Sequence, residues 1–163
     1  MAGQRVVIFG NAGSGKTTLA GQMAAEGGHA VLSLDAIAFG EGTQRRPETD
    51  CVADLQHFIA LNDRWIVEGC YATLAEAALR HADGLIFLNP GVGVCLERCR
   101  KRAWEPDKFS SKVEHDTALA FLLDWVAGYA SRDDEYGLAA HRRVFEAFGG
   151  PKREIGAEGS QPE

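Results

Sequence analysis

The sequence lacks the features of a membrane protein or a disulfide-stabilised protein. No apolar run approaches the roughly 18–20 residues that span a bilayer, and residues 1–5 lead into a short apolar stretch, not the longer apolar core of a leader peptide. The four cysteines include no Cys-x-x-Cys pair, so we expect reduced, partly buried thiols instead of a zinc site or disulfides. We therefore expect a cytoplasmic protein with no membrane partner.

Positively charged residues are fewer than negatively charged ones, with 17 Lys and Arg against 23 Asp and Glu. The net charge is −6 and the pI is near 5.4, which gives no general attraction to nucleic-acid phosphates and disfavours a nucleic-acid partner. A chain of 163 residues, 45% of them hydrophobic, fits a single folded domain. We place this domain at residues 1–155 and expect a disordered, small and polar tail at 156–163. The sequence does not indicate the oligomeric state.

Apolar β-branched runs alternate with helical patterns along the chain, which predicts a three-layer α/β fold with a mostly parallel sheet of about five strands. Residues 36–46 and 104–109 are predicted to be loops, the second forming the turn of a lid-like helix-loop-helix. The expected strands are 5–9, 30–34, 64–67, 85–88 and 152–155, and the expected helices are 16–26, 47–61, 73–81, 92–102, 114–129 and 138–148.

Four residues lie at the carboxyl ends of these strands. They are Gly10, Asp35, Glu68 and Asn89. Because ligands in parallel sheets bind beyond the carboxyl ends of the strands, we expect these four residues to converge on one site.

The segment after the first strand carries the most specific signal in the chain. It matches G-x-x-x-x-G-K-[ST] at every fixed position and lies between a buried strand and a helix. In such a loop the backbone N–H groups and the helix dipole hold phosphates, Lys16 reaches the β- and γ-phosphates, and the Thr17 hydroxyl binds Mg²⁺. The residues expected to bind ATP are Gly10, Asn11, Ala12, Gly13, Ser14, Gly15, Lys16, Thr17 and Thr18.

Two acidic residues at strand ends have open roles. Asp35 can accept the proton of an attacking hydroxyl or hold Mg²⁺ through water, although an aspartate at this position can also simply cap a turn. Glu68 can bind a metal through water or contact the acceptor, and a structural ion pair is the alternative. We assign Asp35 as a catalytic residue and Glu68 as a metal-site residue.

Arg98 and Arg102 are spaced i, i+4 and therefore share one helix face. Such a pair can neutralise charge on a moving phosphoryl group, so we assign both, with Lys16, to catalysis. The alternative is a solvated basic helix end. Arg45 and Arg46 can either recognise an anionic substrate or be surface charges.

Other polar residues carry weaker signals. Lys108 and Lys112 are interpreted as solvated, and the aromatic Trp104 and Trp125 as apolar anchors and not as parts of a ligand site. The five histidines show no pattern of partners and are interpreted as surface or structural residues; they are His29, His57, His81, His115 and His141.

Taken together, these residues resemble the adenylate-kinase-like branch of the P-loop kinases, which includes small bacterial proteins related to adenylate kinase, shikimate kinase and topology-modulation proteins. The resemblance covers about Val6 to Ile155 and rests on the P-loop, on Leu34-Asp35, on residues 65–69 and on Arg98-x-x-x-Arg102. It implies a three-layer P-loop NTPase fold with a five-stranded parallel sheet, Mg-ATP, a mobile lid bearing arginines and phosphoryl transfer to a small acceptor.

The same comparison leaves the acceptor open. Monophosphate kinases usually place an arginine after the acidic-glycine pair of the third strand, and here Cys70 follows Gly69. The leading hypothesis is an ATP-dependent kinase acting on a nucleoside, nucleotide or related metabolite. The alternative is a P-loop NTPase switch read by a protein partner. GTP is disfavoured because the chain has no Asn-Lys-x-Asp motif.

Overall fold

The computed structural model of the chain describes residues 3–39, 44–101 and 111–156. Its centre is one sheet in which every pair of neighbouring strands is parallel, in the order β2-β3-β1-β4-β5. This confirms the predicted parallel sheet. The strands are β1 (Arg5–Gly10), β2 (Ala30–Ser33), β3 (Trp65–Gly69), β4 (Gly84–Leu88) and β5 (Lys152–Ile155).

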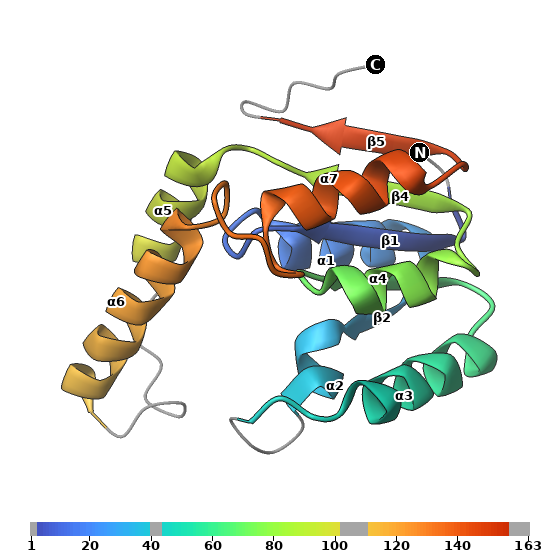
Figure 1. Cartoon of the computed structure of the whole chain (residues 1–163). Coiled ribbons are helices and arrows are strands. Elements are labelled where there is room, and N and C mark those ends of the chain that lie inside the picture. The colour runs from blue at the N-terminus through green and yellow to red at the C-terminus, as the bar shows by residue number, and fades with distance from the viewer. Residues whose placement is uncertain (1–2, 40–43, 102–110, 157–163) are drawn as a thin grey trace.

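Helices cover both faces of the sheet, as predicted for a three-layer α/β fold (Figure 1). Helix α1 lies behind the sheet in that view, whereas α4 and α7 lie in front of it. The helices are α1 (Lys16–Gly27), α2 (Leu34–Phe39), α3 (Glu48–Leu61), α4 (Ala72–Leu79), α5 (Val92–Arg100), α6 (Lys112–Ala127) and α7 (Leu138–Ala147).

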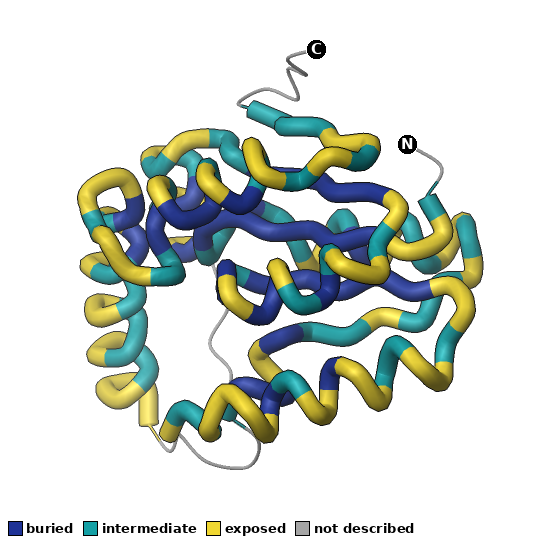
Figure 2. Tube along the Cα trace, turned by 45° about the vertical axis from the view of Figure 1, so that its right-hand side comes forward, coloured by how far each residue is buried: buried dark blue, intermediate teal, exposed yellow. Residues whose placement is uncertain are grey.

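The central strand β1 serves two cores because successive side chains point to opposite faces of a sheet. Val6 and Ile8 pack with Ala20 of α1, while Val7 and Phe9 belong to the larger core, which includes residues of α2, α3, α4 and α7. All four β1 side chains are fully buried. Figure 2 shows the three central strands β3, β1 and β4 as the buried centre of the molecule, so the loop that follows β1 begins from a rigid support.

The predicted loop over residues 36–46 is wrong for residues 36–39, is confirmed for residues 44–46, and lies outside the described residues at 40–43. Residues 36–46 were expected to be irregular, and the second strand was expected to reach residue 34, but β2 ends at Ser33 and α2 follows at once. The reason is packing: Leu34, Ile37 and Ala38 have the i, i+3, i+4 spacing of a helix face and are all buried. Asp35 therefore lies in the first turn of a short helix and not at the end of a strand.

Helices α5 and α6 form an arm beside the body of the molecule (Figure 1). They pack on each other through Cys95, Cys99 and Val126. The predicted loop over 104–109, the end of the predicted helix 92–102 and the tail 157–163 lie outside the described residues. No helix of the described ranges is long and apolar enough to cross a membrane.

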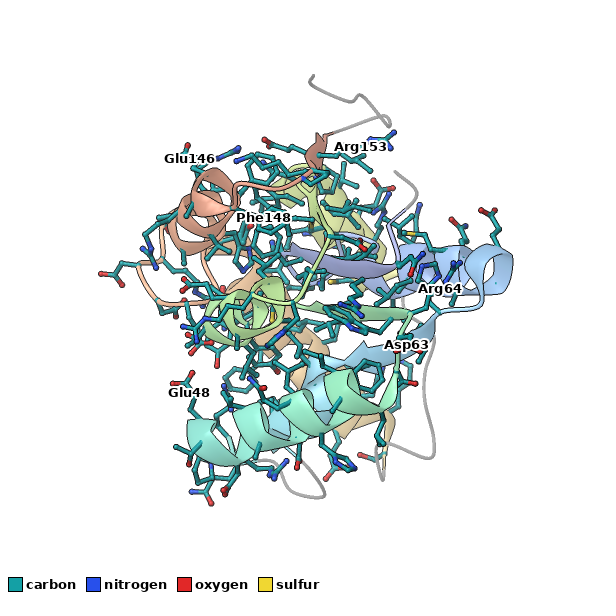
Figure 3. All side chains as sticks on the ribbon, turned by 90° about the vertical axis from the view of Figure 1, so that its right-hand side faces the viewer. Glu48, Asp63, Arg64, Glu146, Phe148 and Arg153 are labelled. Carbon is teal, nitrogen blue, oxygen red and sulfur yellow. The ribbon has the colours of Figure 1, made fainter. Side chains whose placement is uncertain are left out.

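The amino ends of the strands are closed by local contacts. Arg64 Nη1 donates to the carbonyl of Gly27 at the end of α1, at 2.7 Å, and Arg5 Nε donates to the carbonyl of Asp63 at 3.3 Å. Figure 3 views the molecule from this side and shows Asp63 and Arg64 at the turn before β3. The candidate functional site lies at the opposite edge of the sheet, at the carboxyl ends of the strands.

Candidate functional site

The loop after β1 passes very close to α5. Gly13 has φ +78°, and a Cβ atom there would lie 2.6 Å from the carbonyl oxygen of Cys95 and 2.9 Å from the Cys99 sulfur. Gly15 has φ +99° and ends the loop where α1 begins. Only glycine combines these torsions with such contacts at low cost, so the glycine spacing of the motif is explained by the local geometry.

Lys16 and Thr17 begin α1 and face the cavity beyond the loop. Lys16 Nζ donates to the Asn11 carbonyl at 2.8 Å, which folds the lysine back over the loop. Thr17 Oγ1 donates to Glu68 Oε1 at 3.4 Å. The structure therefore brings the two motif side chains and the acidic end of β3 together, as the sequence predicted.

Glu68 is only 4% exposed. Burial raises the pKa of its carboxyl group, while the charge of Lys16 and hydrogen bonds from Ser33 and Thr17 oppose that rise and nearby Asp35 adds to it. Ser33 is its register partner on β2. Among the described residues, Glu68 accepts hydrogen bonds from the Thr17 and Ser33 side chains, so these contacts do not show the predicted alternative of a structural ion pair.

Asp35 is held by an unpredicted partner. Tyr71 Oη donates to Asp35 Oδ1 at 2.6 Å, a short hydrogen bond of the charge-assisted kind. Burial first, and then the Asp35 carboxylate, raise the pKa of Tyr71, so the phenol stays protonated and remains a donor. One Asp35 oxygen is thus fixed by Tyr71.

A cavity of about 670 Å³ connects the loop with this pair. Its lining includes Gly13 of the loop and Lys16 and Thr18 of α1. Its lining also includes four aromatic rings that pack on one another: the ring centroid of Tyr136 lies 5.3 Å from that of Tyr71 and 5.7 Å from that of Trp125, and that of Phe39 lies 6.5 Å from that of Tyr71. We call the four rings Phe39, Tyr71, Trp125 and Tyr136 the aromatic wall.

The sequence did not single out the aromatic wall. Trp125 was interpreted as an apolar anchor, yet it lines the cavity. Tyr71 carried a usable signal, because it lies two residues beyond the end of β3, where a ligand contact is expected. Phe39, Trp125 and Tyr136 come from α2, α6 and the segment before α7, so only the folded chain brings them together.

Of the two predicted catalytic arginines, the structure describes Arg98 alone, and Arg102 lies outside the described residues. Arg98 lines the cavity, and its Nη1 donates to the Ser14 carbonyl at 2.8 Å. Helix α5 is thereby attached to the phosphate-binding loop by a side chain as well as by its contact with Gly13.

Arg45 and Arg46 do not line the cavity. Arg46 Nη1 donates to the Ile37 carbonyl at 2.8 Å and to Asp54 at 2.7 Å. Arg45 Nη1 donates to the Cys51 sulfur at 3.0 Å, and its guanidinium lies over the Tyr71 ring. Arg46 thus joins α2 to α3, whereas Arg45 joins the segment before α3 to Cys51 of α3 and to the Tyr71 ring. Neither contact was expected, because the two alternatives for these arginines were recognition of an anion and surface charge.

Asn89 does not join the site, contrary to the expected convergence of four strand ends. Its amide donates to Glu154 Oε2 at 3.1 Å, and Glu154 is also paired with Arg142. This places the Asn89 side chain toward β5. Of the predicted solvated lysines, Lys112 pairs with Asp116 at 3.1 Å on the exposed face of α6, and Lys108 lies outside the described residues.

No family model matches the sequence, and no curated protein matches it. Solved structures do match its fold. A deoxyadenosine kinase from M. mycoides with bound dATP is 12% identical, with a TM-score of 0.54 over 94% of this chain and 91% of that one. A sugar kinase from Janibacter sp. HTCC2649, without ligand, is 15% identical, with a TM-score of 0.50 over 93% of this chain and 83% of that one.

These likenesses span nearly the whole chain. At such identities they concern the fold. The chain has the three-layer α/β fold of the P-loop kinases.

Proposed function

We propose that the protein is an ATP-dependent phosphotransferase that moves the γ-phosphoryl group of Mg-ATP to a hydroxyl group of a small molecule. The observation that carries the proposal is the cavity of about 670 Å³ that reaches from Lys16 to the Asp35–Tyr71 pair. A site that only hydrolyses nucleotide needs room for water beyond the phosphates. This cavity has a second, aromatic end.

The donor end binds phosphate through the loop and the start of α1. Backbone N–H groups and the positive end of the helix dipole attract the phosphate oxygens. The ammonium of Lys16 has three donors, and one is taken by the Asn11 carbonyl, so the others remain for the β- and γ-phosphates. Gly10, Ala12, Ser14 and Thr18 complete the proposed ATP contacts.

Mg²⁺ fits the pair Thr17 and Glu68. A hydroxyl and a carboxylate are hard oxygen ligands of the kind that Mg²⁺ prefers, and these two lie 3.4 Å apart at the cavity. No cluster of three or more His, Cys, Asp or Glu side chains suited to a metal occurs among the described residues. Magnesium bound here would complete its shell with phosphate oxygens and water, and it would neutralise phosphate charge.

At the acceptor end, Asp35 orients the attacking hydroxyl and takes its proton. Tyr71 holds Oδ1, which leaves Oδ2 to accept the hydrogen bond of the acceptor. The hydroxyl oxygen bonds to the γ-phosphorus as the bond to the bridging oxygen breaks, ADP leaves with that electron pair, and the proton goes to Asp35. Lys16 and Arg98 offset the charge of the moving group, and Arg102 is proposed to join them.

The lining of the acceptor end favours an uncharged acceptor with a flat ring face. Among the described lining residues, the cations Lys16 and Arg98 are bonded to the phosphate-binding loop, whereas the aromatic wall adjoins the carboxylate of Asp35. A phosphate or carboxylate on the acceptor would meet that carboxylate, and like charges repel at this range. A nucleoside fits this chemistry better than a nucleoside monophosphate.

The matched structures support the proposal by analogy, since one is a deoxyadenosine kinase with bound dATP and the other a sugar kinase. An enzyme of this kind draws on the Mg-ATP of the cytoplasm, where we place it. The experiment is ADP release from Mg-ATP, measured alone and with nucleosides, their monophosphates, sugars and shikimate, and Lys16→Ala is the control.

Strong stimulation by one uncharged acceptor, abolished in the control, is the expected result. Turnover that no acceptor stimulates, and that rises only with a protein partner, would contradict the kinase and favour the NTPase switch. Failure of the wild-type protein to bind ATP would remove both.

A further inference from the structure

His141 is a fully buried side chain with a partner on each ring nitrogen. Its Nδ1 lies 2.7 Å from Tyr129 Oη, and its Nε2 lies 2.8 Å from the Cys70 carbonyl oxygen. The imidazole also stacks on the Phe9 ring, with centroids 5.0 Å apart. The ring is therefore fixed in position and in orientation.

The partners assign the tautomer. A carbonyl oxygen only accepts hydrogen bonds, so Nε2 must carry the proton, and Nδ1 then accepts from the Tyr129 hydroxyl. Burial lowers the pKa of His141 to about 4, so the ring is neutral at neutral pH. The result is one directed chain of hydrogen bonds from Tyr129 through His141 to Cys70.

Both ends of this chain are close to the proposed site. Cys70 lines the cavity and precedes Tyr71, the residue that holds Asp35. Tyr129 follows the last turn of α6, and the carbonyl of Val126 in that turn accepts from Asn11 Nδ2 of the phosphate-binding loop at 3.3 Å. The end of α6 is thus bonded directly to the phosphate-binding loop, and it is bonded through Tyr129 and His141 to Cys70 in the turn after β3.

We propose that His141 is a positioning residue: it holds the turn after β3 so that Tyr71 and Asp35 face the donor loop across the cavity. The catalytic importance of His141 rests on the proposed function, but its hydrogen bonds to Tyr129 and Cys70 do not depend on which acceptor is bound. The Nε2–H bond to the Cys70 carbonyl is the part that positions the turn. The Nδ1 bond anchors the ring to Tyr129.

The two ring bonds are separable by substitution. In His141→Gln the side-chain amide nitrogen reaches the place of Nε2 and keeps the donor to Cys70. In His141→Asn the shorter amide reaches only the place of Nδ1 and keeps the partner of Tyr129. A role in packing alone would be served about equally by the two variants, whereas positioning requires the Gln variant to be the better one.

The Cys70 thiol offers a readout that needs no acceptor. Of the four cysteines, Cys51, Cys95 and Cys99 are buried and Cys70 is partly exposed. Burial raises the pKa of the Cys70 thiol to about 12, so the held turn should react slowly with iodoacetamide. Mass spectrometry then reports where alkylation occurs, and labelling of the three buried thiols reports general unfolding.

We expect His141→Asn to speed alkylation of Cys70 about tenfold, the equivalent of one lost hydrogen bond, without labelling the other three cysteines. His141→Gln should stay near the wild-type rate. His29→Gln is the matched control, because His29 also binds a backbone carbonyl, that of Gly3 at 3.0 Å, away from the cavity. Equal rates for the Asn and Gln variants would overturn the proposal.

Kinetics supply the second test. With Mg-ATP and the most stimulating acceptor of the panel, His141→Asn should lower kcat and raise KM for the acceptor while leaving KM for ATP unchanged, and His141→Gln should restore both. An unchanged acceptor KM in the Asn variant would contradict positioning. If no panel compound stimulates turnover, the proposed function fails, and the alkylation result still decides the role of His141.

Discussion

The donor and acceptor sides of the cavity are built in different ways. The donor side is one continuous loop whose contacts are mostly made by backbone, with Lys16 and Thr17 added at its end. The acceptor side is assembled from side chains of α2, α6, the turn after β3 and the segment before α7. A site made by backbone groups limits the conformation of a few consecutive residues. A site made by side chains from separate elements can change its chemistry by one substitution at a time.

The largest expected effect separates the two sides at Asp35. Asp35→Asn keeps the shape of the side chain and removes the proton acceptor, so turnover with the acceptor should fall about 10²- to 10⁴-fold. Binding of a non-hydrolysable ATP analogue, measured by calorimetry, should stay unchanged. Loss of nucleotide binding in this variant would mean that the two sides are not distinct.

Lys16→Ala tests the donor side. Removal of the ammonium from the phosphates should lower turnover about 10²- to 10³-fold, the usual cost of one preorganised charge-stabilising group, and should weaken analogue binding as well. The paired measurement of turnover and binding distinguishes it from Asp35→Asn. Normal analogue affinity would show that Lys16 does not contact phosphate before reaction.

Acid should affect the acceptor side through the neutral His141. Its folded pKa of about 4 lies below the unfolded value of 6.5, so the unfolded chain binds more protons in that window. The neutral His141 ring therefore contributes fully to the stability of the fold above pH 6.5, and this contribution is lost as the pH falls toward 4. The loss amounts to about 3 kcal/mol of unfolding free energy.

Denaturant unfolding at pH 7, 5.5 and 4.5 measures this loss. In His141→Gln the loss over the same range should be smaller by that amount, since an amide does not titrate. An identical pH dependence in the variant would assign the acid sensitivity to other groups.

The smallest effect is expected at Tyr71. Tyr71→Phe keeps the ring in the aromatic wall and removes the hydrogen bond to Asp35, so kcat/KM for the acceptor should fall about tenfold. The KM for ATP should not change. A loss as large as that of Asp35→Asn would indicate that the phenol, and not the carboxylate, handles the proton.

The same contrast explains what the sequence could predict. The loop from Gly10 to Thr17 was predictable because its function is encoded by neighbouring residues. Asp35 and Glu68 were found from their places near strand ends, although α2 carries Asp35, and six residues of amphipathic pattern were too few to reveal that helix. The parallel sheet followed from the apolar runs of β1, β2, β3 and β4, which alternate with helical patterns, whereas β5 is a charged segment that adds one edge of the sheet.

Other parts of the site have no local signature. His141 bonds a carbonyl 71 residues away, and no periodicity of its own helix points to that partner. Trp125 and Tyr136 meet only because α6 ends beside the segment that leads into α7. For Arg46, charge alone could not distinguish recognition of an anion from a bond between two helices.

The contacts of Arg46 and Cys51 have a wider consequence. Arg46 bonds both Ile37 and Asp54, and the Cys51 sulfur bonds the Ile37 carbonyl at 3.3 Å, so α2 and α3 are fastened to each other by their own residues. The stretch from α2 through α3 therefore holds its own arrangement in part through bonds between its own residues. The positions of Asp35 and Phe39 at the cavity therefore depend on the contacts of α2 with α3 as well as on α2 itself.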